Sequence, residues 1–338
     1  MVRAMLRCLC MLSTVVLLAG CRGPQNFLFA EGTAADRLAR LGWIALISFS
    51  VVTVVVWCLL VAVVSRRRGS FGEHAPVDTT SGINWIIVGG LIVPITVLST
   101  LFFFSLDTLR DFPMGKLMHP APSIRVTARQ WWFDAEYLDP SLPNRFHAPT
   151  ELHIPAGAPV NLELVTADVI HSFWVPKLHG KVDMVPGMTN RIRLQADHPG
   201  IYDGECGEYC GMQHAHMRLR VFADTPADYA RWKSRQLADA SEPQTPAEQR
   251  GKADFMAAPC AVCHTIRGTD AHGTVGPDLT HVGSRTRIAG GMLVNNTANL
   301  QAWIVHAQSF KPGTQMPDIN SLSGQQLSEL TLYLQSLK

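Results

Sequence analysis

Three stretches of the chain are strongly apolar, and they differ in length. The first, at positions 8–19, follows Arg3 and Arg7 and is too short to span a bilayer, which needs about 20 apolar residues. The other two, Leu41–Val64 and Ile83–Leu106, are uncharged throughout and long enough to cross a membrane with modest tilt. The pattern predicts a leader followed by two transmembrane helices.

The leader, residues 1–20, combines a positive start, an apolar run and small residues before Cys21. This order is typical of a signal peptide and resembles a bacterial lipobox. We therefore expect cleavage before Cys21 and a lipid on that residue, because acyl chains anchor a protein through their buried methylenes. A plain signal peptide and an uncleaved anchor are the alternatives. Residues 21–40 would then form a periplasmic N-terminal segment.

Three arginines, Arg66, Arg67 and Arg68, directly follow the first predicted span. The positive-inside rule places this short connection in the cytoplasm, so both chain ends lie outside. The sequence predicts a multi-pass protein of the bacterial inner (cell) membrane, in contact with membrane lipid. Everything after the second span is expected on the periplasmic side.

Between positions 120 and 237 the pattern changes from helical to alternating. Polar and apolar residues alternate in Ile124–Ala128, Val160–Leu164 and Met217–Val221, and turn signals such as Pro155–Gly157 separate the segments. Short alternating segments divided by turns predict an all-β sandwich or barrel.

The last part of the chain returns to a helical pattern after a polar, proline-bearing linker at 238–246. Ser323–Gln326 predicts the start of a final helix whose leucines fall on one face. We expect a small all-α domain at 247–338. The fold class is thus multidomain, with two transmembrane helices, a β domain and an α domain. The net charge of +2 gives no sign of nucleic-acid binding.

A segment rich in sulfur and imidazole lies near the end of the β region, with Cys206, Cys210, His214 and Met217 close together. Thiolates and thioethers favour copper over hard cations, and a thioether argues against zinc. An isolated loop seldom completes a metal site, so we expect a further ligand, for which His171 is the best candidate. A structural zinc site or a disulfide is the alternative, but a disulfide explains neither the His nor the Met.

Cys260-Ala-Val-Cys263-His264 is the attachment motif of c-type haem. The two cysteines would bind the haem vinyl groups, and His264 follows in position to bind iron. Met316 is the expected sixth ligand, because a Met ligand raises the potential as an electron carrier requires. The alternative sixth ligands are Met256, His281 and Met292.

Together these motifs resemble one family. Cys-x-Glu-x-Cys-x3-His-x2-Met, with Asp-Val-x-His-Ser upstream, resembles the dinuclear copper A site of cytochrome c oxidase subunit II, a haem-copper oxidase subunit. The C-terminal motifs resemble a fused class I cytochrome c domain. The resemblance covers roughly residues 30–338 and implies a cupredoxin-like fold for residues 120–237. The copper A ligands that it implies are His171, Cys206, Glu208 through its carbonyl, Cys210, His214 and Met217.

The resemblance implies two further roles. Trp131 would take in electrons from cytochrome c, where the alternative is an ordinary core aromatic. The carboxylate of Glu208 would bind a magnesium ion shared with subunit I, where the alternative is a solvated acid. In the family the second helix usually begins with an acidic residue, and Thr80–Trp85 contains none.

The implied function is electron entry into a cytochrome c oxidase. Electrons would pass from a cytochrome c-type donor through covalent haem c and copper A to subunit I, where O2 is reduced to water with proton pumping. This chain has no oxygen-reducing site of its own, so it is an enzyme only as a subunit of the complex with subunits I and III. The alternative is a membrane-tethered haem c and copper subunit of another reductase, such as a copper-containing nitric oxide reductase. A quinol oxidase subunit would lack the copper ligands.

Overall fold

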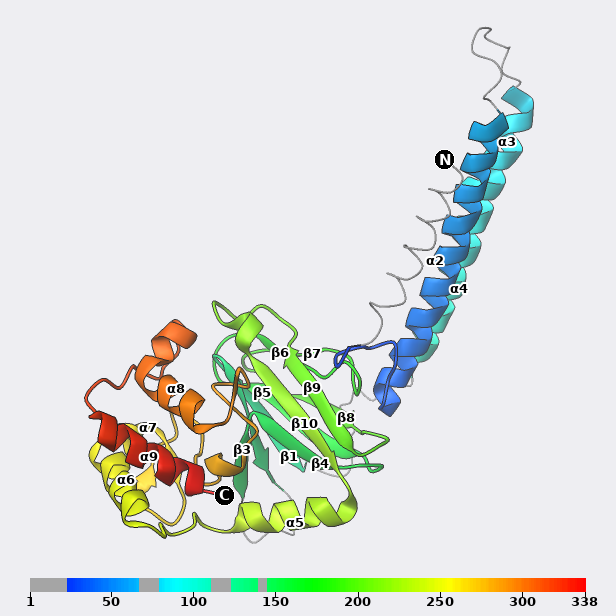
Figure 1. Cartoon of the computed structure of the whole chain (residues 1–338). Helices are drawn as coiled ribbons and strands as arrows, with labels where there is room; N and C mark the ends of the chain where they lie inside the picture. Colours follow the sequence, from blue (N-terminus) through cyan, green and yellow to red (C-terminus); the bar gives the residue numbers. More distant parts are fainter. Residues whose placement is uncertain (1–22, 67–78, 111–122, 139–144) are drawn as a thin grey trace. The chain divides into compact units, whose positions relative to one another are not determined.

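The computed structural model describes residues 23–66, 79–110, 123–138 and 145–338 (Figure 1). The predicted signal peptide, Cys21, Arg67 and Arg68 lie outside these ranges. The described chain divides into two units, one formed mainly by apolar helices and the other by the β-strands and the C-terminal helices.

The helical unit holds two long apolar helical segments. The first is α2 (Thr33–Arg66), and the second is built from α3 (Thr79–Ile87), a π-helical turn η2 (Val88–Ile92) and α4 (Val93–Arg110). The π-helical turn ends two residues before Pro94, which has no N–H to donate to the preceding turn, and such irregularities are common near proline.

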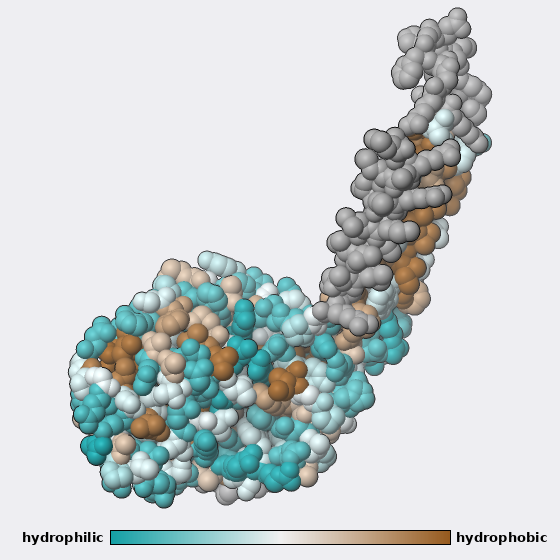
Figure 2. Space-filling view, in the orientation of Figure 1, coloured by the Kyte–Doolittle hydropathy of each residue, from teal (hydrophilic) through white to brown (hydrophobic). Residues whose placement is uncertain are grey.

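Both segments are long enough to cross a bilayer. Within Thr33–Ser65 and Gly82–Arg110, 18-residue stretches have mean hydropathies of 2.8 and 2.4, and neither of these stretches is buried within the described chain. Figure 2 shows hydrophobic side chains along the visible part of these helices. A helix that exposes apolar side chains on all sides is typical of a membrane span.

The β-sandwich domain contains two five-stranded sheets, in the orders β3-β2-β1-β5-β8 and β4-β10-β9-β6-β7. Both sheets are mixed, because β1 pairs with β5, and β10 with β4, in parallel. The strands of the first sheet are β1 (Ile124–Arg129), β2 (Trp132–Tyr137), β3 (Phe146–Pro149), β5 (Val160–Thr166) and β8 (Asn190–Leu194). Those of the second are β4 (Glu151–Pro155), β6 (His171–Trp174), β7 (Val182–Met184), β9 (Gly200–Cys206) and β10 (Arg218–Asp224).

The alternating sequence pattern corresponds to the two faces of each sheet. In β1, Ile124, Val126 and Ala128 are buried, while the residues between them are only partly so. Across the core, the rings of Phe133 and Phe173 meet edge to face at 6.4 Å. The predicted all-β sandwich is therefore confirmed, and its packed core gives the loops at its ends a rigid base.

Helix α5 (Pro226–Leu237) completes the β-sandwich domain. Thr225 caps its start by accepting a hydrogen bond from the backbone N–H of Asp228. Trp232 on this helix stacks on the ring of His153 at 4.0 Å and contacts Tyr137.

The C-terminal domain is mainly helical, as expected, with two short hairpins that the sequence pattern did not predict. Its elements are α6 (Pro246–Ala257), α7 (Cys260–Cys263), β11 (Thr265–Ile266), β12 (Ala271–His272), η4 (Val282–Ser284), β13 (Arg287–Ile288), β14 (Leu293–Val294), α8 (Thr297–Phe310) and α9 (Gly324–Ser336).

The first and last helices of this domain cross in close contact. A Cβ atom on Gly251 of α6 would lie 2.1 Å from the carbonyl oxygen of Glu329 on α9, so the crossing requires glycine. Beside it, the rings of Phe255 and Tyr333 pack edge to face at 6.3 Å. This crossing closes the domain around the segment that bears Cys260 and Cys263.

Candidate metal centre and haem site

The sulfur-rich segment connects two neighbouring strands at one end of the sandwich. It leaves β9 at Cys206, includes the short turn η3 (His214–His216), and returns into β10 directly after Met217. His171 is the first residue of β6, which pairs with β9 so that Phe173 lies opposite Cys206. The second sheet therefore brings the distant histidine to the loop, as the sequence analysis expected.

The candidate copper ligands face one another at close range. Cys206 Sγ lies 3.8 Å from His171 Nδ1, and Cys210 Sγ lies 3.7 Å from His214 Nδ1. The donor atoms of His171, Cys206 and Cys210 all lie within 4.8 Å of one another. The two remaining candidates complete the group, with Met217 Sδ 3.9 Å from Cys210 Sγ and the carbonyl of Glu208 3.1 Å from Cys206 Sγ.

The second ring nitrogen of His171 is held by a carboxylate. Its Nε2 lies 2.7 Å from Asp168 Oδ1, while the other oxygen of Asp168 accepts a hydrogen bond from the backbone N–H of Gln130 at 2.7 Å. A carboxylate on the outer nitrogen fixes the ring so that its inner nitrogen faces a metal. Burial opposes the charged form of His171, but hydrogen bonds with Cys206 and Asp168 outweigh it and raise its pKa.

The two cysteines behave as one unit. The hydrogen bond between their sulfurs lowers the pKa of Cys206, while the same bond and then burial raise the pKa of Cys210. The two cysteines are buried, 4% and 3% exposed, and a bound cation would displace the protons of their thiols. A buried pair of sulfurs flanked by two imidazoles and a thioether fits copper by its chemistry.

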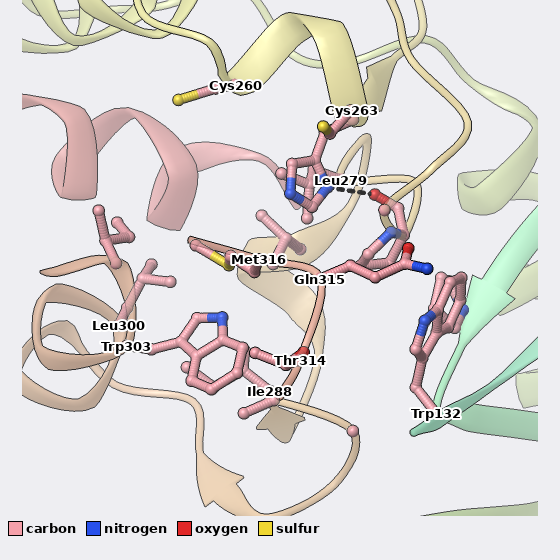
Figure 3. A pocket seen from close by; sticks show the side chains of 18 of the residues that line it. Trp132, Cys260, Cys263, Leu279, Ile288, Leu300, Trp303, Thr314, Gln315 and Met316 are labelled. Carbon is pink, nitrogen blue, oxygen red and sulfur yellow. Dashed lines mark hydrogen bonds between the residues drawn. The ribbon is translucent and has the colours of Figure 1, made fainter. Parts of the chain in front are cut away.

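A cavity of about 210 Å³ lies beside the haem-attachment motif (Figure 3). Cys260 and Cys263 reach it from α7 and Met316 from the opposite side, with Trp303 and Leu300 among its apolar lining. The cavity is mainly apolar, with thiols, an imidazole and a thioether on its wall, which fits a haem attached through two cysteines.

His264 is prepared to act as an iron ligand. Its Nδ1 lies 2.8 Å from the carbonyl oxygen of Pro277, which fixes the ring and leaves Nε2 available. Burial lowers the pKa of His264, which keeps the imidazole neutral. A Cβ atom on Gly276 would lie 2.5 Å from His264 Cε1, so glycine makes room for the ring.

The loop that bears Met316 is shaped by Gln308 at the end of α8. Gln308 Nε2 donates to the carbonyls of Thr314 and Met316, each at 2.7 Å, and its Oε1 accepts from the N–H of Gly313 at 3.0 Å. Met316 lines the cavity. The alternative sixth ligands Met256, His281 and Met292 are not among the described residues that line it.

Trp131 is 6% exposed, and its indole Nε1 donates to the carbonyl of Cys210 at 2.9 Å. The side-chain amide of Gln130 donates to the same carbonyl at 2.9 Å. The tryptophan is therefore joined to the metal loop by a hydrogen bond.

Glu208 is exposed, and its carboxylate accepts a hydrogen bond from the backbone N–H of Tyr209 at 3.3 Å.

Three cationic residues that line the cavity were missed by sequence reasoning: Arg285, Arg287 and Lys311. They belong to no motif, and only the fold brings them to the haem-attachment segment. The positive charge of the two arginines in an apolar cavity suits the carboxylates that a haem carries. Lys311 instead donates from Nζ to the backbone carbonyls of Trp131 and Ala289.

Two family models match the chain. Residues 130–223 match cytochrome c oxidase subunit II, periplasmic domain, and residues 248–338 match cytochrome c. Subunit 2 of cytochrome c oxidase from Alkalihalophilus pseudofirmus is 33% identical over 332 residues, covering 96% of this chain and 94% of that protein. The corresponding Bacillus subtilis protein is 28% identical over 96% of this chain and 95% of its own length. The solved periplasmic domain of subunit II from Bradyrhizobium japonicum aligns with 26% identity and a TM-score of 0.33, over 35% of this chain and 96% of that one.

A β-sandwich of the oxidase subunit II type followed by a cytochrome c domain defines a membrane electron-transfer protein, and these two domains imply copper A and haem. The chain belongs to the cytochrome c oxidase subunit 2 family, and so to an oxidoreductase complex, the haem-copper terminal oxidase. The resemblance inferred from the sequence is thereby confirmed, as is the expected fold class.

Proposed function

We propose that this chain is the subunit through which electrons enter a cytochrome c oxidase of the bacterial inner membrane. A cytochrome c-type donor would supply the C-terminal domain, and subunit I would receive the electrons for reduction of O2 to water with proton pumping. The observation that carries the proposal is the convergence of two buried thiols, two imidazoles and a thioether at one end of the sandwich.

In this proposal His171, Cys206, Glu208, Cys210, His214 and Met217 hold a dinuclear copper A, while Cys260 and Cys263 attach haem c and His264 and Met316 bind its iron. Bound there, copper and haem would supply reversible one-electron redox chemistry. The protein contributes rigidity. Asp168 and Pro277 each fix one ligand imidazole through a hydrogen bond, and paired strands hold the loop that bears the cysteines. Ligands that move little during a redox change keep the reorganisation energy low.

The exposed carboxylate of Glu208 would share a magnesium ion with subunit I. Its carbonyl faces the sulfur of Cys206, whereas its exposed side chain would meet another subunit. Subunit III would complete the membrane complex.

The test is to purify the complex through an affinity tag on this chain. We expect copper by elemental analysis and haem that stays with the polypeptide after denaturation. We also expect partner subunits that carry out oxygen uptake with reduced cytochrome c, and a C-terminal domain that protease cleaves from the periplasmic side. A complex that lacks copper, or whose haem is released on denaturation, would overturn the corresponding assignment.

A further inference from the structure

The β-sandwich domain and the C-terminal domain are joined by hydrogen bonds between residues far apart in the sequence. The backbone N–H of Arg218 donates to the carbonyl of Gly290 at 3.0 Å, next to the metal loop. At a second point, Glu151 of β4 accepts from the backbone N–H groups of Thr286 and Arg287 at 2.7 and 3.2 Å. These amides lie on both domains and report directly on whether the two are docked.

The contact becomes tightest around Trp131. Lys311, directly after α8, donates from Nζ to the carbonyl of Trp131 at 2.6 Å and to that of Ala289 at 3.2 Å. The next residue, Pro312, accepts from the side-chain amide of Gln213 at 3.0 Å. Gln213 directly precedes the candidate ligand His214, so this loop touches the metal loop as well as the tryptophan.

Two glycines allow this close approach. A Cβ atom on Gly290 would lie 2.5 Å from both the carbonyl oxygen of Trp131 and Lys311 Nζ. One on Gly313 would lie 2.7 Å from Met212 Cε of the metal loop and in ordinary contact, at 3.4 Å, with the indole ring of Trp131. Both residues have positive φ, +66° and +83°, which glycine adopts without strain. The surface of the C-terminal domain therefore fits around the backbone and ring of Trp131.

Lys311 is an unusual residue for such a place. It is only 2% exposed, and no carboxylate among the described residues forms an ion pair with it. Burying an ammonium without a counter-ion is unfavourable, so hydrogen bonds to two carbonyls must offset part of the cost. Burial lowers its pKa to about 7. A leucine or methionine would fill the space without this penalty, but neither could donate a hydrogen bond to the carbonyl of Trp131.

We propose that Lys311 is the positioning residue that docks the haem-bearing domain on Trp131 and thereby creates a hydrogen-bonded route from the Met316 loop to the copper loop. The route runs from the Met316 loop to Lys311, across its bond to the carbonyl of Trp131, and from the indole Nε1 to the carbonyl of Cys210. Electron transfer is faster through covalent and hydrogen bonds than through space, so losing one hydrogen bond from this route should slow the transfer. This inference rests on the proposed function, because it assumes that both centres are loaded.

The role of Trp131 changes accordingly. It is buried against the C-terminal domain and does not offer its ring to a separate donor. An external donor would reduce the C-terminal domain, and Trp131 would serve the internal step that follows.

The experiment compares Lys311→Met with Lys252→Met in the complete oxidase complex. The control removes a lysine of the same domain whose partner is Glu242, at 3.0 Å on the surface. Copper and haem contents are measured first. Hydrogen exchange is then followed in the peptides that contain the Arg218, Thr286 and Arg287 amides. Rapid reduction by an external donor separates the haem-reduction phase from the copper-reduction phase, and the potentials of both centres are titrated.

For Lys311→Met we expect exchange at these amides to rise about tenfold, on the scale of one lost hydrogen bond to a charged group. The haem-reduction phase and both potentials should not change, whereas the copper-reduction phase should slow. Lys252→Met should match the parent protein. Should Lys311→Met fail to assemble, Gly290→Ala disturbs the same contact from the other side. It should also raise exchange at these amides and slow the copper-reduction phase while leaving the haem-reduction phase unchanged.

Unchanged exchange together with an unchanged copper-reduction phase would overturn the inference. So would a shifted haem potential with unchanged exchange, because Lys311 would then act on the haem carboxylates rather than on docking. A parent complex without copper or covalent haem would contradict the proposed function instead, and the contents measured first distinguish the two failures.

Discussion

The indole Nε1 of Trp131 donates a hydrogen bond to the carbonyl oxygen of Cys210 at 2.9 Å, which ties the aromatic cluster to the metal loop. Gln130 donates to the same oxygen, so the loop is held at this point by two side chains from the start of the sandwich. The backbone of a candidate copper ligand is thus fixed by residues about 80 positions earlier in the chain.

Replacing Trp131 with Phe should keep an aromatic ring in the core but remove this donor. We expect copper to remain bound, the copper loop to lose about 1 kcal/mol of stabilisation, and reduction of copper by haem to slow. Rapid-reduction kinetics and copper analysis of the purified complex measure both effects. Trp232→Phe on α5 is the control and should leave transfer unchanged. Equal rates in the two variants would contradict a role for the indole.

Replacing Cys210 with Ser should abolish the mixed-valence copper spectrum and leave haem absorbance intact. Cys210 contacts both His214 and Met217, so its replacement would remove a thiolate from the group of residues that would hold copper. Electron paramagnetic resonance with copper analysis makes the measurement. Cys58→Ser, at an exposed cysteine of α2, is the matched control. A normal copper signal in Cys210→Ser would refute the ligand assignment.

The sequence predicted the two sites because most of their residues are local. Cys206 to Met217 occupy a single loop, and Cys260 to His264 occupy a single turn. The spacing of these residues along the sequence is therefore enough to predict the kind of group that each segment would bind. His171 lies far from the loop in the sequence and was expected because an isolated loop seldom completes a metal site. In the structure the pairing of β6 with β9 brings it to Cys206.

The contact between domains could not be predicted in this way. Lys311 and Trp131 lie 180 positions apart, and nothing near Lys311 in the sequence distinguishes it from a surface lysine before a proline. Gly290 also looks like an ordinary turn residue, although a Cβ atom added to it would lie 2.5 Å from the carbonyl oxygen of Trp131. Such features depend on how two separately folded surfaces meet, and periodicity within one segment does not contain that information.

Replacing Met316 with Ala should lower the haem potential, because a Met ligand to iron raises it. The loop should keep its shape, since Gln308 binds the backbone carbonyls of Thr314 and Met316 rather than the thioether. Redox titration of the complex measures the change. Met256→Ala and Met292→Ala are matched controls that should retain the parent potential. A normal potential in Met316→Ala would assign the sixth ligand to another residue.

Replacing Gly251 with Ala should destabilise the C-terminal domain by about 1–3 kcal/mol, the usual cost of overpacking. The new methyl would lie 2.1 Å from the carbonyl oxygen of Glu329 and 2.9 Å from Tyr333 Cβ, so α6 and α9 would have to separate. Thermal unfolding followed by haem absorbance gives the measurement. Gly324→Ala is the control, because no atom lies within 4 Å of its added Cβ. Equal transitions would show that the crossing tolerates a side chain.

The pair formed by His147 and Asp134 should make the β-sandwich domain more stable in mildly acidic solution. The Nδ1 of His147 lies 2.9 Å from Asp134 Oδ2, and this hydrogen bond raises the pKa of His147 above its usual value of 6.5 despite partial burial. The folded state therefore binds the proton more tightly than the unfolded state. The stabilisation is fully present below pH 6.5 and is lost as the pH rises through the higher folded pKa. Because the ring is 41% exposed, solvent screens the pair and the effect is modest. Chemical unfolding across this pH range should show a steeper decline in the parent protein than in Asp134→Asn or His147→Gln, whereas His272→Gln should match the parent protein. An equally steep decline in Asp134→Asn would mean that another group controls it.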